Sequence, residues 1–145
     1  MGETQGQPSV RRDRHGRGLR GPLAPPTSPA TVPRAERFGD LVVDAVDRLE
    51  PRWGSRLTAV EVEVRDVPDP RDAPPDEVML AEHRTDRSGR IATLVLYRRP
   101  VEFRAPEHTS LVNLIRDLVA EHLAEVLGTS AGEIDPSYDQ RSDEA

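Results

Sequence analysis

Two glutamates and a histidine near the end of the chain have a spacing that could support metal chemistry. Glu121 and Glu125 are four residues apart, which on an α-helix places their side chains roughly 40° apart around the axis, so both carboxylates could reach one ion. His122 lies on another part of the circumference. Oxygen ligands suit hard cations such as Mn²⁺ or Mg²⁺ better than zinc. The alternative is a solvated polar stripe that continues through Asn113 and Asp117.

A third ligand for such an ion would have to come from the segment after the helix, where Glu133 and Asp135 carry carboxylates. Because two carboxylates alone make a weak site, we predict no cofactor and at most a weakly held divalent cation. His122 is near Ile115 and Leu118 on the helix circumference. We therefore expect a half-buried imidazole whose nitrogens find a partner.

Other kinds of catalytic site find little support in the sequence. Cysteine is absent, which excludes disulfides, thiolate nucleophiles and cysteine zinc ligands together. All 20 basic residues are arginine, which excludes a Schiff-base or phosphate-loop lysine. No serine stands in a Gly-x-Ser-x-Gly context. His83 and His108 each stand alone in the sequence, and we expect both at the surface.

Two helices are predicted from apolar side chains that recur at spacings of three and four. The first covers residues 35–50 and is expected to stop at Pro51 and Gly54. Trp53 is expected to close the core over its end. The second helix, residues 110–127, is apolar around most of its circumference, so we expect it to be largely packed.

The ends of this second helix have residues that favour helix termini. Ser110 is the predicted N-cap, and Gly128 stands where a helix commonly ends in a left-handed residue. These two positions fix where Glu121, His122 and Glu125 lie on the helix.

Alternating apolar residues predict the strands. Residues 57–67 alternate and predict a strand with one wet face; residues 78–82 are a short candidate, and residues 91–97 are apolar on both faces, which predicts the most buried strand. Between the last two, residues 85–90 have the composition of a hairpin turn, with Gly89 able to adopt a positive φ. The predicted fold class is α+β, with a small mixed sheet of three to four strands packed by an N-terminal and a C-terminal helix.

The chain divides into regions of opposite charge. Residues 1–34 contain six arginines against two acidic residues, although the whole chain carries a net charge of −6. This arm is also rich in glycine and proline, so we predict that it is disordered, followed by one domain over residues 35–136 and a disordered acidic tail over residues 137–145. Residues 11–20 could bind RNA or an acidic partner; the alternative is a solvated tail that folds back on the acidic domain. No apolar stretch is long enough for a membrane span and no signal sequence is visible, so we expect a cytoplasmic protein.

Several local strings, taken in order, resemble a known family. These are a helix beginning Glu36-Arg37-Phe38-Gly39-Asp40-Leu41-Val42, a strand that ends in Asp66-Val67-Pro68, the string Leu96-Tyr97-Arg98-Arg99-Pro100-Val101-Glu102, and a last helix that ends at Gly128. Together they resemble the minimal bacterial zincin-like metallopeptidases. The arginine-rich arm that leads into Gly21-Pro22-Leu23-Ala24-Pro25-Pro26 is similar to the actinobacterial branch of that family. The resemblance covers roughly residues 35–135 and the arm, and implies a zincin-like fold.

Active members of that family carry His-Glu-x-x-His-x-x-Gly on the last helix and a carboxylate three residues later. The two imidazoles bind Zn²⁺ and the glutamate activates its water. With the motif glycine at Gly128, the ligand positions hold Glu121, Glu125 and Ala131, and the base position holds His122. None of the four retains the expected residue.

Three functions remain open from the sequence. The resemblance together with the degenerate motif favours a metallopeptidase homologue that has lost catalysis and binds a peptide or protein partner in the cleft. An active metal-dependent peptidase with carboxylate ligands, in which His122 would serve as the base, is the first alternative. An RNA- or ribosome-associated adaptor that acts through the basic arm is the second.

Overall fold

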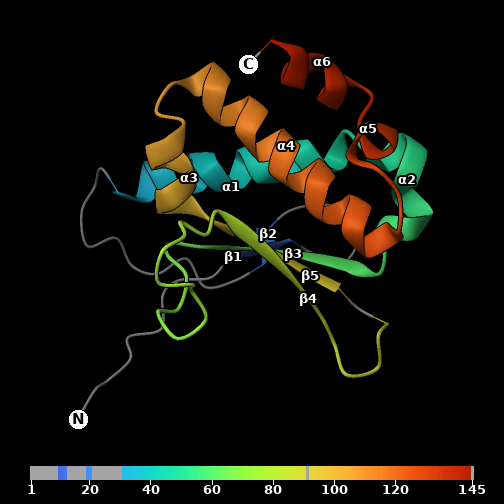
Figure 1. The fold of residues 1–145 in the computed structure, drawn as a ribbon, viewed down its shortest axis with the longest axis horizontal. Coiled ribbons are helices and arrows are strands. Elements are labelled where there is room, and N and C mark those ends of the chain that lie inside the picture. Colours follow the sequence, from blue (N-terminus) through green and yellow to red (C-terminus); the bar gives the residue numbers. More distant parts are fainter. Residues whose placement is uncertain (1–9, 13–18, 21–30, 91, 145) are drawn as a thin grey trace.

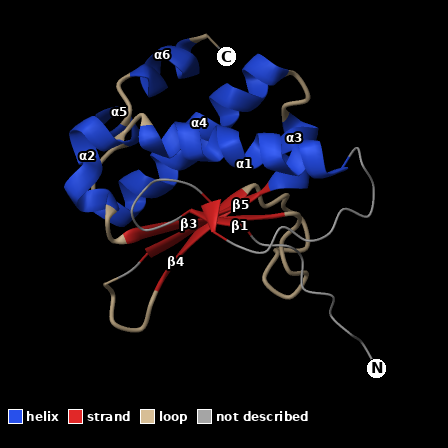
Figure 2. Cartoon of the chain, turned by 180° about the vertical axis from the view of Figure 1, so that it is seen from behind, coloured by secondary structure: helices blue, strands red, loops and turns tan. Residues whose placement is uncertain are grey.

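The helices of this protein gather on one face of a small mixed sheet, which makes it an α+β fold (Figure 1). The computed structural model describes residues 10–12, 19–20, 31–90 and 92–144, with the backbone alone up to residue 32. Figure 2 shows the same arrangement from behind, with the helices above and the strands below. The second face of the sheet is therefore not covered by the labelled helices.

The sheet has the strand order β2-β1-β3-β5-β4. Its strands are β1 (Val10–Arg12), β2 (Leu19–Arg20), β3 (Val60–Arg65), β4 (Ala81–Thr85) and β5 (Ala92–Tyr97). β3 and β5 are parallel, whereas β4 pairs with β5 in the antiparallel sense and forms the edge of the sheet. The small mixed sheet expected from the sequence is confirmed, but it has five strands and not three to four, because β1 and β2, in the segment predicted to be a disordered arm, add to β3.

Six helices are found among the described residues. They are α1 (Thr31–Asp47), α2 (Glu50–Leu57), α3 (Arg98–Arg104), α4 (His108–Leu127), α5 (Ala131–Ile134) and α6 (Ser137–Asp143). α4 is the longest, with 20 residues, and it packs against α1 and against β4 and β5 of the sheet. No helix in the described part of the chain is long and apolar enough to cross a membrane.

The core lies between the helices and one face of the sheet. Val62 of β3, Leu94 and Leu96 of β5, Phe38 of α1 and Ile115 of α4 are each at most 1% exposed. β5 is buried on both faces, as its sequence predicted, because Val95 and Tyr97 on its other face are also covered.

The second face of β3 differs from the expected wet face. Glu63 is 2% exposed, and Arg65 Nε donates a hydrogen bond of 2.6 Å to its carboxylate. A charged side chain can be buried when it is paired in this way, and alternation of residue type alone does not reveal such a pair.

The first helical region does not stop where proline was expected to end it. α1 ends at Asp47, and a second helix, α2, begins at Glu50 with Pro51 in its first turn. Proline fits that position because the N–H that it lacks would have no partner inside the helix. Trp53 packs against the core as expected, and its Nε1 donates a 3.1 Å hydrogen bond to the Ile134 carbonyl.

Three further differences concern which elements form and where they begin. The strand expected over residues 78–82 lies at Ala81–Thr85. Helix α3 was not predicted. Ser110 does not cap α4, which begins at His108 after Glu107 and has no side-chain cap hydrogen bond. The expected hairpin turn is present, with Gly89 at φ 69°.

The expected tail over residues 137–145 contains helix α6 instead, with only Ala145 outside the described residues. Arg141, the basic residue of this helix, is largely buried and ion-paired, and these pairs attach the segment to the domain. Of the predicted disordered arm, β1, β2 and the first residues of α1 are described; most of residues 11–20 lie outside the described residues.

Candidate functional site

The residues that sequence analysis singled out lie on the second half of α4. The helix ends at Gly128, which has φ 71° and donates its N–H to the Ala124 carbonyl. This left-handed conformation favours glycine, so the predicted helix end is confirmed. Glu121 and Glu125 are exposed on the helix, whereas His122 is half-buried.

Glu121 and Glu125 do not converge on one point. The Tyr138 hydroxyl of α6 donates a 2.7 Å hydrogen bond to Glu121 Oε1. Glu125 is engaged on the other side of α4, where its Oε2 lies 3.6 Å from His83 Nε2 of β4. The two carboxylates therefore have partners in different elements, α6 for Glu121 and β4 for Glu125. The two glutamates do not continue as one solvated polar stripe along α4.

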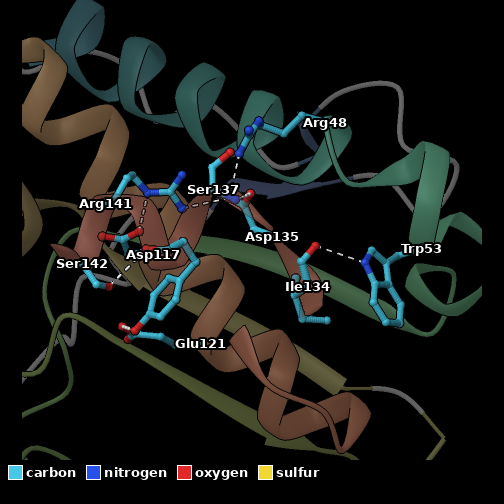
Figure 3. Close-up of polar contacts among 10 residues, drawn as sticks. Arg48, Trp53, Asp117, Glu121, Ile134, Asp135, Ser137, Arg141 and Ser142 are labelled. Carbon is cyan, nitrogen blue, oxygen red and sulfur yellow. Dashed lines mark hydrogen bonds and ion pairs between the residues drawn. The ribbon is translucent and has the colours of Figure 1, made fainter. Parts of the chain in front are cut away.

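The expected third ligands are also placed elsewhere. Asp135 is 3% exposed and accepts hydrogen bonds from Arg48 and Arg141, both at 2.9 Å. Arg141 also donates a 2.6 Å hydrogen bond to Asp117 of α4 (Figure 3). Glu133 is exposed. Asp135 therefore holds α5 and α6 against α1 and α4, and it is committed to this network.

The charge state of Asp135 follows from the same network. Burial alone would raise the pKa of this carboxyl, but hydrogen bonds from Arg141, the Ser137 backbone and Arg48 outweigh burial and leave the pKa below its ordinary value. The ionised form is thus the one that the folded protein stabilises.

His83 and His122 meet across the gap between the sheet edge and α4. Their Nδ1 atoms are 2.9 Å apart, and their ring centroids are 5.2 Å apart with the ring planes at 70°. The expectation that His83 stands alone at the surface is wrong, because β4 carries it to a helix 39 residues later in the chain. His108 is exposed at the start of α4, as expected.

The environment of His122 favours its neutral form. Burial, and secondly the neighbouring His83, lower the pKa of His122 below its ordinary value, although Glu125 and Glu121 act in the opposite direction. The expected half-buried imidazole with a partner is confirmed. Sequence alone offered no signal for the identity of that partner, since the two histidines share no motif.

The outer edge of β4 presents backbone groups beside this histidine pair. Tyr97 N donates to the Leu80 carbonyl at 2.9 Å, so the backbone of Leu80 faces β5. Every second residue of β4 after Leu80 faces β5 in the same way, and these residues are Glu82 and Arg84. In an antiparallel ladder the intervening residues direct N–H and C=O outward. The backbone groups of Ala81, His83 and Thr85 therefore point away from the sheet.

Among the residues that the structure describes, no group of three or more His, Cys, Asp or Glu side chains is arranged to hold a metal ion. A zinc ion held at Glu121, Glu125 and Ala131, as the degenerate motif would require, does not fit, because the two carboxylates diverge and alanine has no ligand atom. Comparison with models of known protein families finds no match, and comparison with curated proteins finds none either.

Proposed function

We propose that this chain is a zincin-like protein that has lost the residues of zinc hydrolysis and binds an extended peptide along the edge strand β4. The observation that carries the proposal is the outward-facing backbone of Ala81, His83 and Thr85 next to α4. An extended peptide can add to such an edge through main-chain hydrogen bonds, and its alternate side chains then give specificity.

The loss of catalysis is supported by the positions of the motif residues. Glu121 is engaged by Tyr138, and Asp135 is engaged by Arg48 and Arg141. Water activation by zinc requires three protein ligands and an open position, which this set of side chains does not provide. Peptide binding along the edge requires none of these groups.

The side chains around the edge indicate what kind of peptide would bind. Side chains of His83 and of Glu125, which is 69% exposed, lie on the helix side of β4. A peptide residue that points to this side would approach the Glu125 carboxylate. We therefore expect a basic residue, Arg or Lys, at that position of the peptide.

The backbone contact can be tested at a single position. His83→Pro removes the outward N–H of the edge without removing a hydrogen bond to β5, whereas His83→Ala removes the same side chain and keeps the N–H. Phage-displayed random linear peptides selected on the full chain in EDTA supply the ligands. We expect the selected peptides to bind His83→Pro about tenfold more weakly, and His83→Ala with nearly unchanged affinity.

Two results would contradict the proposal. Equal binding of the selected peptides to His83→Pro and His83→Ala would show that the edge backbone is not used. Cleavage of these peptides by the pure protein with added Zn²⁺, lost in Glu121→Ala, would show instead that the motif positions are catalytic.

A further inference from the structure

The histidine pair between β4 and α4 has a geometry that suits a bound ion as well as a shared proton. His83 and His122 direct the same ring nitrogen, Nδ1, toward one point, with 2.9 Å between the two atoms. Each ring comes from a regular element, a strand and a helix, that is fixed in the fold by its own packing. The two nitrogens are therefore held close together before any ligand arrives.

The second nitrogen of His83 determines which tautomer suits this arrangement. His83 Nε2 lies 3.6 Å from Glu125 Oε2, so a proton on Nε2 faces a carboxylate. A neutral imidazole protonated at Nε2 has a free electron pair at Nδ1. Carboxylates commonly hold the non-ligating N–H of a metal-bound histidine in this manner.

We propose that His83 and His122 form a chelating site for a late first-row divalent cation, Zn²⁺ or Cu²⁺, bound through Nδ1 of both imidazoles. Glu125 would accept the proton on Nε2 of His83, the ring nitrogen that does not bind the ion. Imidazole nitrogen is a preferred ligand of both ions, with Cu²⁺ bound more tightly than Zn²⁺ by a given set of ligands.

The distances are compatible with such an ion. Two nitrogens bound to one tetrahedral Zn²⁺ at ~2.0–2.1 Å lie roughly 3.3 Å apart. The observed 2.9 Å separation needs to increase by only a few tenths of an ångström as the cation replaces the shared proton. His83 is 27% exposed, so the site is open to solvent on the side of β4.

This site overlaps the degenerate motif positions only in part. It shares His122 and Glu125 with them, but His122 acts as a ligand and not as a base, and Glu125 accepts a proton and does not bind the ion. The second ligand is His83 of the edge strand, which is outside the motif, and neither Glu121 nor Ala131 takes part. Within the described part of the chain no third side chain completes the ligand set, so water would fill the other positions. The bound ion would join the edge strand to α4, and the inference does not depend on peptide binding.

The ligand count can be measured directly. Full-length protein is titrated with Zn²⁺ by calorimetry, and the Cu²⁺-loaded protein is studied by pulsed electron paramagnetic resonance, which counts bound imidazoles. We expect one ion per chain with two imidazoles. His83→Ala and His122→Ala should each reduce the count to one and weaken Zn²⁺ binding at least about tenfold. His108→Ala, the matched surface histidine, should change neither result.

Glu125→Gln tests the arrangement without removing a ligand or disturbing the packing of the half-buried His122. Because Glu125 contacts a ligand and not the ion, the substitution should weaken Zn²⁺ binding only roughly tenfold and keep two imidazoles on Cu²⁺. A spectrum with one imidazole or none in the unaltered protein would overturn the proposal. So would an unchanged Zn²⁺ affinity in His83→Ala, a variant that circular dichroism can show to be folded. Peptide binding in EDTA is unaffected by either result, so the two proposals fail separately.

Discussion

The side of α4 that faces the C-terminal helices and the side that faces β4 both carry ionisable residues, but their surroundings differ. On the first side, Asp117 and Asp135 are held by arginines, with Asp135 almost fully buried. On the second side, the Nδ1 atoms of His83 and His122 lie 2.9 Å apart, beside an exposed glutamate. The first side is a closed network that holds elements together, whereas the second keeps polar atoms within reach of solvent and ligands.

This difference shows that two adjacent residues at the motif positions can have different surroundings. Glu121 and His122 are adjacent in the sequence, yet Glu121 is bound by Tyr138 and His122 faces the edge strand. Buried ion pairs are costly to break because each lost partner leaves an uncompensated charge. The buried pairs of Asp135 with Arg48 and Arg141 should therefore respond strongly to substitution. The contacts nearer the surface, those of Glu121 on the closed side and of His83 on the open side, should respond weakly.

The largest effect is expected for Asp135→Ala. Removal of this carboxylate leaves Arg48 and Arg141 without their shared acceptor, and we expect the free energy of unfolding to fall by about 3 kcal/mol. Urea denaturation measures the change. Asp143→Ala, in the exposed part of the same helix α6, is the control and should have almost no effect. Equal stabilities of the two variants would show that the network does not hold the C-terminal segment.

Acid should weaken the same network in a defined pH range. Because the folded pKa of Asp135 is below the ordinary value of 3.8, its ionised form stabilises the fold above that value, and this contribution is lost as the pH falls through the folded pKa. We expect the unfolding free energy to decrease below about pH 4. Asp135→Asn should flatten this part of the profile, and an identical profile in both proteins would contradict the assignment.

On the open side, His83→Ala should change the unfolding free energy by about 1 kcal/mol or less, since it removes one hydrogen bond from a partly exposed side chain. Thermal and urea unfolding in EDTA, compared directly with Asp135→Ala, give the contrast between the two sides. A loss as large as that of Asp135→Ala would mean that the histidine pair is a structural anchor.

The smallest effect is expected for Tyr138→Phe, which removes only the hydroxyl that bonds to Glu121. The bond is at the surface, so we expect a loss of about 0.5 kcal/mol in urea denaturation. The double variant that carries Tyr138→Phe and Glu121→Ala should be no less stable than Glu121→Ala alone, because the partner of the hydroxyl is already absent in Glu121→Ala. An additional loss would point to a role for Tyr138 beyond this bond.

Much of the fold could be predicted because its signals are local. The burial of β5, the apolar face of α1 and the end of α4 at Gly128 all follow from the spacing of a few neighbouring residues. α6 could not be predicted in this way. Its polar sequence suggests a tail, and it is held by Arg141, whose acceptors Asp117 and Asp135 come from other segments.

The candidate site shows the same division. That Glu121, Glu125 and Ala131 stand where a zinc peptidase needs two imidazoles and an acid is a matter of residue identity, so it is known before folding. That His83 meets His122 depends on the register of β4 against β5. Side chains alternate between the two faces of a strand, so a shift of one residue would turn His83 away from α4. Only the packed sheet and helix decide that contact.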